Sequence, residues 1–112
     1  MEIIDFGTLV GFADARFGSE ALTVSPLARN ADNVVCLRVG PGGRIGRHPA
    51  VGSQVFAVVE GVAVAVGAEG VEQVLSPGRA AVWAPGEEHE TWTEHGFTAM
   101  VLEGPELTPS RG

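Results

Sequence analysis

The chain has 112 residues, of which 45% are hydrophobic, so it fits one domain of ordinary size with a single core. Its formal net charge of −7 argues against a nucleic-acid partner, whose phosphates it would repel, and against an anionic membrane surface. Its apolar runs are far shorter than the ~20 residues that span a bilayer, and its single cysteine excludes an internal disulfide.

Glycine and proline divide the chain into short segments, with 16 glycines and 7 prolines in total. Between residues 40 and 86 no segment free of both is as long as a normal helix, which makes a helix-rich fold untenable. In chain order, the segments predict strands at residues 22–24, 34–39, 44–48, 54–60, 62–66, 71–75, 80–84, 89–93 and 97–102. Short strands at regular intervals, separated by Gly/Pro turns, predict an all-β sandwich or barrel.

The spacing of these segments predicts a single domain over residues 1–112, because no linker and no repeat interrupts it. We expect the barrel core at about residues 34–102, an N-terminal segment wrapping the barrel, and a loosely ordered tail over residues 103–112. Residues 1–5 have neither the basic start nor the apolar segment of a signal peptide, so we expect a cytoplasmic protein. We expect Cys36 to be a small buried residue.

Two predicted strands, residues 62–66 and 97–102, are apolar on both faces. A sheet that is apolar on both faces needs a second cover, which is either the N-terminal segment or another subunit. Twofold dimers are the commonest oligomers, so we expect a homodimer.

Two of the three histidines occupy equivalent places beside the predicted strands. His48 follows a glycine-rich turn, His89 follows Pro85 and Gly86, and Gln54 opens the strand after His48. In a barrel such positions lie side by side at one rim, where neutral imidazoles point a nitrogen inward. A lone histidine is more often an ordinary surface or core residue, so the spacing suggests a shared site without establishing one.

Residues 42–61, GGRIGRHPAVGSQVFAVVEG, resemble the first motif of the cupin family. That motif runs glycine, five residues, His-x-His, three or four residues, Glu, six residues and glycine. Gly42, His48 and Gly61 stand at their expected places. The resemblance implies an all-β cupin fold, a double-stranded β-helix or jelly-roll barrel, for residues 34–102.

Residues 78–93 resemble the second cupin motif, which runs glycine, five residues, Pro-x-Gly, two residues, His, three residues and Asn. Gly78, Gly86 and His89 match it, whereas Ala84 stands at the proline position. Two motifs in order and at the expected separation make the resemblance specific for the fold.

The departures from the motifs concern the metal ligands that the resemblance implies. Ala50 replaces the second histidine, Gln54 replaces the glutamate, and Thr93 replaces the final asparagine. One interpretation is that His48, Gln54 and His89 bind a divalent ion (iron, manganese, nickel or zinc), leaving coordination positions open. The other is that the metal has been lost and the same trio binds a small organic ligand by hydrogen bonds.

The resemblance implies a range of metal-dependent reactions on small molecules, including those of dioxygenases, isomerases and decarboxylases. It does not select one of them. The chain has no tyrosine, and its remaining histidine is His95, so no separate general base stands out. The alternative to an enzyme is a non-catalytic module that binds or senses a metabolite.

Charged residues surround both motifs, and for most of them a solvated turn or surface is the simpler interpretation. Glu88 and Glu90 are candidates for orienting a histidine or replacing the missing carboxylate, although Glu90 falls on the opposite strand face from His89. His95 is expected in a turn, and Arg44 and Arg47 are candidates for holding an anionic substrate. If Gln54 points inward, Phe56 does too and gives the pocket an apolar wall.

Overall fold

The computed structural model describes residues 1–7 and 11–110, and nearly all of its regular structure is β-strand. A one-turn 3-10 helix at Arg16–Gly18 is the helical element among those residues. The strands are β1 (Glu2–Asp5), β2 (Phe12–Ala13), β3 (Thr23–Val24), β4 (Ala28–Arg29), β5 (Asn33–Val39), β6 (Arg44–Pro49), β7 (Ser53–Gly61), β8 (Ala63–Val66), β9 (Glu72–Leu75), β10 (Arg79–Trp83), β11 (Glu88–Trp92), β12 (Phe97–Gly104) and β13 (Thr108–Pro109). The all-β prediction is confirmed.

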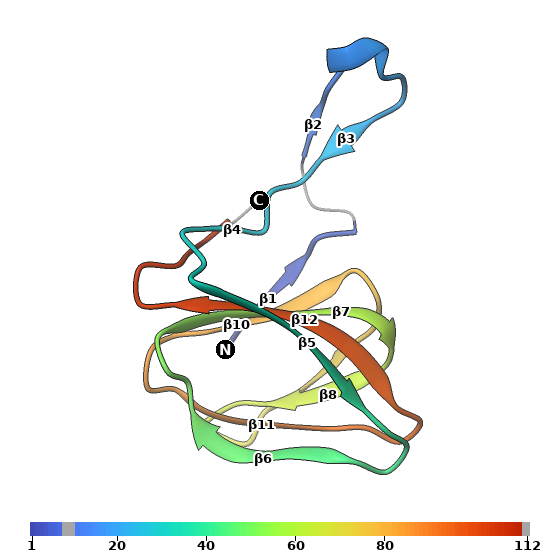
Figure 1. Cartoon of the computed structure of the whole chain (residues 1–112). Coiled ribbons are helices and arrows are strands. Elements are labelled where there is room, and N and C mark those ends of the chain that lie inside the picture. The colour runs from blue at the N-terminus through green and yellow to red at the C-terminus, as the bar shows by residue number, and fades with distance from the viewer. Residues whose placement is uncertain (8–10, 111–112) are drawn as a thin grey trace.

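Two antiparallel sheets form the walls of a barrel (Figure 1). The larger sheet has the order β1-β10-β7-β12-β5, and the smaller one has the order β6-β11-β8-β9. Strands distant in sequence are therefore neighbours in space, as in a jelly roll. This crossing places the two motif strands β6 and β11 side by side in one wall, and β7 in the facing wall.

The main core fills the space between the two sheets, because alternate side chains of each strand point inward. Its aromatic members pack edge to face: the Phe56 ring centroid lies 5.5 Å from that of Trp83 and 5.6 Å from that of Phe97. The inward residues of β8 are the small Ala63 and Ala65, both fully buried. Small side chains on one wall leave room for the large rings on the other.

The turn between β7 and β8 explains why the first motif closes on glycine. Gly61 has a φ of +73°, and a Cβ there would stand 2.2 Å from the carbonyl oxygen of Gly96. Only glycine combines this backbone conformation with so close an approach.

A second core covers the outer face of the larger sheet. Ile4 and Leu107 pack there against outward side chains of β7 and β10, with Phe6 and Leu27 beside them. The N- and C-terminal segments thus supply the cover that the apolar sheet requires. The tail expected to be loose contains β13, which pairs with β4, and the buried Leu107; residues 111–112 lie outside the described residues.

The N-terminal segment divides into two parts. β1 pairs with β10 and so forms one edge of the larger sheet. β2 and β3 pair with each other, and this hairpin stands away from the barrel in Figure 1. No helix in the described part of the chain is long and apolar enough to cross a membrane.

The prediction for Cys36 is wrong, because its side chain is exposed. β5 is the edge strand of the larger sheet, and its side chains alternate between the core and solvent. Val35 and Leu37 take the inward positions, so Cys36 and Arg38 face out.

Candidate functional site

The two motif histidines are direct neighbours across the smaller sheet. His48 of β6 and His89 of β11 are register partners, so their side chains leave the same face, with ring centroids 4.4 Å apart. His89 is buried, whereas His48 is exposed at the rim. The indole of Trp83 stacks on His89 at a centroid distance of 4.0 Å and an interplanar angle of 18°, which fixes the orientation of that imidazole.

Both imidazoles use Nδ1 in the same way. His48 Nδ1 lies 2.7 Å from the carbonyl oxygen of Gly46, and His89 Nδ1 lies 3.0 Å from that of Glu87. A carbonyl oxygen only accepts, so each Nδ1 carries a proton and donates. In the neutral tautomers each Nε2 then keeps its lone pair, which is the usual arrangement of a metal-binding histidine.

The surroundings of His89 favour its neutral form. Burial lowers the pKa of His89 below the ordinary value of 6.5, and the neighbouring His48 lowers it further, against the raising effect of the Glu87 carbonyl. His89 is therefore neutral at physiological pH.

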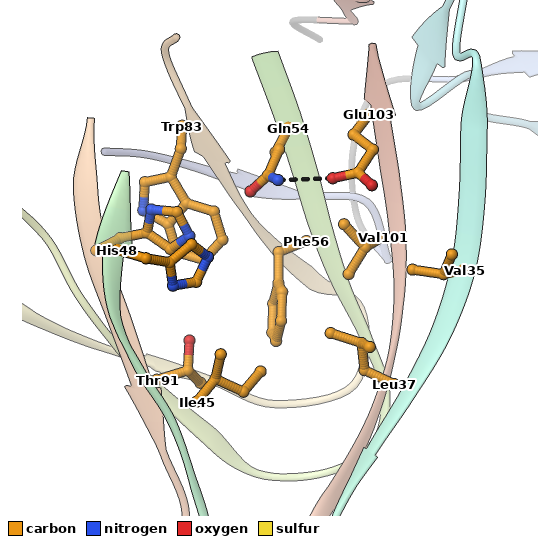
Figure 2. A pocket seen from close by; sticks show the side chains of 11 residues that line it. Val35, Leu37, Ile45, His48, Gln54, Phe56, Trp83, Thr91, Val101 and Glu103 are labelled. Carbon is orange, nitrogen blue, oxygen red and sulfur yellow. Dashed lines mark hydrogen bonds between the residues drawn. The ribbon is translucent and has the colours of Figure 1, made fainter. Parts of the chain in front are cut away.

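Gln54 and Glu103 face each other on adjacent strands of the larger sheet. They are register partners between β7 and β12, and Gln54 Nε2 donates to Glu103 Oε2 at 2.6 Å. The other carboxylate oxygen of Glu103 accepts a hydrogen bond from Asn33 Nδ2 at 2.8 Å. The side-chain oxygen of Gln54 is consequently turned toward the side of the cavity where His48 lies (Figure 2).

These side chains border one cavity of about 190 Å³ between the sheets. Figure 2 shows His48 and Trp83 on one side and Gln54 and Glu103 across from them. The remaining walls are mostly apolar and comprise Val35, Leu37, Ile45, Phe56, Thr91 and Val101. The cavity thus has a polar end, an apolar body and, among the described residues, no lysine or arginine in its lining.

The structure brings His48, Gln54 and His89 to the same cavity, together with Trp83 and Glu103, which were not assigned to it from the sequence. Glu103 had been placed in the tail. The signal that would have found Glu103 is strand parity, because it continues the inward series of Val101 on β12.

No family model matches the chain, and no curated protein matches it. Solved structures do. A cupin-2 domain protein from Shewanella frigidimarina matches with a TM-score of 0.54 and 19% identity over 69% of each chain. A conserved protein with a double-stranded β-helix domain from Klebsiella pneumoniae matches with a TM-score of 0.60 and 21% identity, over 76% of this chain and 82% of its own. The chain has the cupin fold.

A third structure, a predicted oxalate decarboxylase from Thermotoga maritima, matches with a TM-score of 0.58 and 16% identity over 71% of this chain and 68% of its own. Identities this low establish the shared fold and not a shared reaction.

Two positions where this chain departs from the cupin motifs have structural roles. Ala50, in place of the second motif histidine, is buried in the main core. Thr93, in place of the final asparagine, donates from Oγ1 to the carbonyl of Val62 at 2.7 Å and accepts from the N–H of Gly96 at 3.0 Å. Neither residue borders the cavity.

The acidic residues around His89 point elsewhere. Glu88 is exposed, and Glu90 lies on the outer sheet face, where its carboxylate is 3.5 Å from Arg44 and 3.9 Å from Arg47. Arg47 also donates to backbone carbonyls beyond β8. Both arginines are therefore engaged outside the barrel, and the possibility that they hold an anionic substrate in the cavity is not supported.

Glu87 and His95 complete the ionisable groups near the second motif. Burial alone would raise the pKa of Glu87, but hydrogen bonds from the Met1 ammonium and the N–H of Ala84 lower it overall. His95 is 88% exposed and sits in the turn before β12, as expected.

The donor set fits a borderline divalent ion in part. Two imidazoles whose Nδ1 atoms are already committed can offer Nε2 to zinc, nickel, iron or manganese, and Gln54 Oε1 adds a neutral oxygen. Across residues 1–7 and 11–110, no group of three or more His, Cys, Asp and Glu side chains is placed to hold an ion. A third protein ligand therefore has to come from the Gln54 amide.

Proposed function

We propose that this cupin binds a divalent metal ion at His48, His89 and Gln54 and a small molecule in the adjoining cavity. The observation that carries the proposal is the pair of neighbouring imidazoles whose Nδ1 atoms are both committed to backbone carbonyls. This leaves the Nε2 atoms of two neighbouring rings as lone-pair donors, and two such nitrogens can serve as two ligands of one cation.

A bound ion would act there as a Lewis acid on a ligand oxygen. The protein's own contribution is to hold one imidazole neutral by burial, to fix its ring by stacking on Trp83, and to surround the ligand with apolar walls. The exposed rim at His48 provides the route of entry. Oxalate decarboxylation is the activity predicted for one of the similar structures, but no described residue in the lining of this cavity is an arginine or lysine that could hold a dianion.

Calorimetric titration of the untagged, metal-free protein with Ni²⁺, Zn²⁺, Mn²⁺ and Fe²⁺ (the last under anaerobic conditions) tests the proposal. We expect one ion per chain, and an ion at 100 times its Kd should stabilise the fold by about 2.7 kcal/mol. His48→Ala and His89→Ala should each abolish this binding. His95→Ala is the matched control, because it removes the exposed histidine outside the cavity and should leave Kd unchanged.

Failure of the wild-type protein to bind any of these ions would contradict the metal proposal. Equal binding by the His48→Ala and His89→Ala variants would also contradict it.

The second candidate function is non-catalytic binding of an organic metabolite, without a metal. It is favoured by Trp83 Nε1, which is buried and has no acceptor among the described residues although Trp83 borders the cavity. A buried unpaired donor costs about 1–3 kcal/mol, which an acceptor on a ligand would offset. Native mass spectrometry of the gently purified protein distinguishes the two, because an organic ligand adds a mass that chelators do not remove.

A further inference from the structure

Glu103 is a cavity carboxylate that the cupin motifs do not include. It stands opposite Gln54 in the β7–β12 register, in the row where the first motif calls for a glutamate. Both of its oxygens accept hydrogen bonds from side-chain amides, one from Gln54 and one from Asn33. Position 54, where the motif has a glutamate, carries no carboxylate in this chain. Glu103 on the neighbouring strand β12 supplies one directly opposite that position.

The hydrogen bond from Gln54 to Glu103 determines which way the amide faces. A carboxylate accepts but does not donate, so Gln54 has to present Nε2 to it, and Oε1 then faces the opposite way. Figure 2 shows that oxygen on the side of His48. Without Glu103, nothing among the described contacts of Gln54 would prevent the amide from turning its NH₂ group toward the imidazoles.

The same bond changes the chemistry of the amide. A hydrogen bond to an ionised acceptor is about twice as strong as a neutral one, and at 2.6 Å this one is short. This hydrogen bond polarises the amide and places more negative charge on Oε1. A carboxylate that accepts a hydrogen bond from a metal-binding histidine raises the basicity of that histidine in the same way. A neutral amide oxygen is a weak ligand, and this polarisation strengthens it.

We propose that Glu103 is a positioning residue that orients and polarises Gln54 Oε1 as the third metal ligand. This inference rests on the metal-binding function proposed above. The carboxylate that cupins place on β7 acts here from β12, through the Gln54 amide. A purely structural alternative is that the chain Gln54–Glu103–Asn33 only ties β7, β12 and β5 together at the rim.

Metal affinity and metal-free stability, measured together, separate the two roles. Glu103→Gln keeps the size of the side chain but removes the charge, and should weaken Ni²⁺ or Zn²⁺ binding by about 10- to 100-fold, as for other partners behind a metal ligand. A structural role would instead lower the melting temperature of the metal-free variant and leave its metal Kd at the wild-type value.

The exchange variant Gln54→Glu/Glu103→Gln sharpens the test. It preserves the hydrogen-bonded chain, because the new carboxylate at position 54 accepts from the amide at position 103, which can still accept from Asn33. It also moves the charge to the ligand position, so we expect a metal Kd at or below that of the wild type. Asn33→Ala is the control: it removes the other hydrogen bond to Glu103 and should change Kd less than threefold.

Wild-type affinity in Glu103→Gln would overturn the inference while leaving the metal site at His48 and His89 intact. An exchange variant that binds as weakly as Glu103→Gln would also overturn it. If the wild-type protein itself binds no ion, the proposed function fails first, and that result is distinct from either of these.

Discussion

At the scale of single residues, His89 shows how burial selects a protonation state. Its imidazole is 4% exposed, stacked on Trp83 and adjacent to His48, and its Nδ1 proton is donated to a backbone carbonyl. Burial and the neighbouring His48 oppose a second proton on Nε2, and together they outweigh the Glu87 carbonyl, which favours one. The histidine that lies deepest in the cavity is thus the one best prepared to serve as a neutral ligand.

This environment predicts a pH dependence of stability for the metal-free protein. The pKa of His89 is lower in the folded state than in the unfolded chain, so its contribution is fully present above the unfolded value of 6.5. It is lost as pH falls from about 6.5 toward the folded pKa, with a slope of at most about 1.4 kcal/mol per pH unit for one proton. Urea unfolding between pH 8 and pH 5 measures it.

The matched variant for this experiment is His89→Asn, whose amide can still donate to the Glu87 carbonyl but does not titrate. Its free energy of unfolding should change less than that of the wild type over the interval. A wild-type slope equal to that of His89→Asn would show that burial does not shift the His89 pKa.

The sequence allowed the three motif residues of the cavity to be named, and missed Glu103 for a definable reason. His48, Gln54 and His89 occupy recognisable motif positions, so their residue types and spacing are enough to identify them from the sequence. Glu103 has no motif, and its importance depends on β12 lying beside β7, a long-range pairing that local patterns do not specify. The predicted strand ended at residue 102. Glu103 was therefore not recognised as an inward-facing position of that strand.

At the scale of elements, turn chemistry made the strands predictable. Every predicted strand from residue 34 onward coincides with an observed one to within two residues at each end, because Gly and Pro mark the turns between them. The N-terminal hairpin and β13 were harder, since they are two-residue pairings with little periodicity. The alternation on β5 was misjudged for Cys36 because β5 is an edge strand with one solvated face.

Thr93 joins the end of β11 to the start of β8 and to the turn before β12. Thr93→Val removes the hydroxyl that serves the Val62 carbonyl and the Gly96 N–H, so it should lower the free energy of unfolding by about 1–3 kcal/mol. Thr93→Ser keeps the hydroxyl and should cost less. Metal affinity should be unchanged in both, and a tenfold rise in the Kd of Thr93→Val would mean that this position acts on the site after all.

At the scale of the whole molecule, the outer face of the smaller sheet is the apolar surface that no described segment covers. Val62, Val74 and Trp92 are 46%, 54% and 42% exposed there, around a groove of about 400 Å³. The outer corners differ in charge, with Arg44 on edge strand β6 and Glu72 on edge strand β9. A twofold axis parallel to the strands would place β6 of one copy against β9 of the other, bringing opposite charges together.

The homodimer expected from the sequence therefore stays a prediction, now with a definite interface. Sedimentation velocity should show a dimer for the wild type. Val74→Lys should give a monomer, because it places a positive charge in the apolar face, opposite Arg44 of the second copy. Val51→Lys alters a still more exposed valine outside this face, in the turn before β7, and should remain dimeric. A monomeric wild type would contradict the prediction.

The proposed ion is bound by residues of both walls of the barrel, His48 and His89 from one and Gln54 from the other. Crystals of the untagged protein grown with Ni²⁺ and measured at the nickel absorption edge would locate it directly. We predict one anomalous peak in the cavity, within bonding distance of Nε2 of His48, Nε2 of His89 and Oε1 of Gln54. An empty cavity, or nickel bound only at the exposed His95, would contradict the central claim.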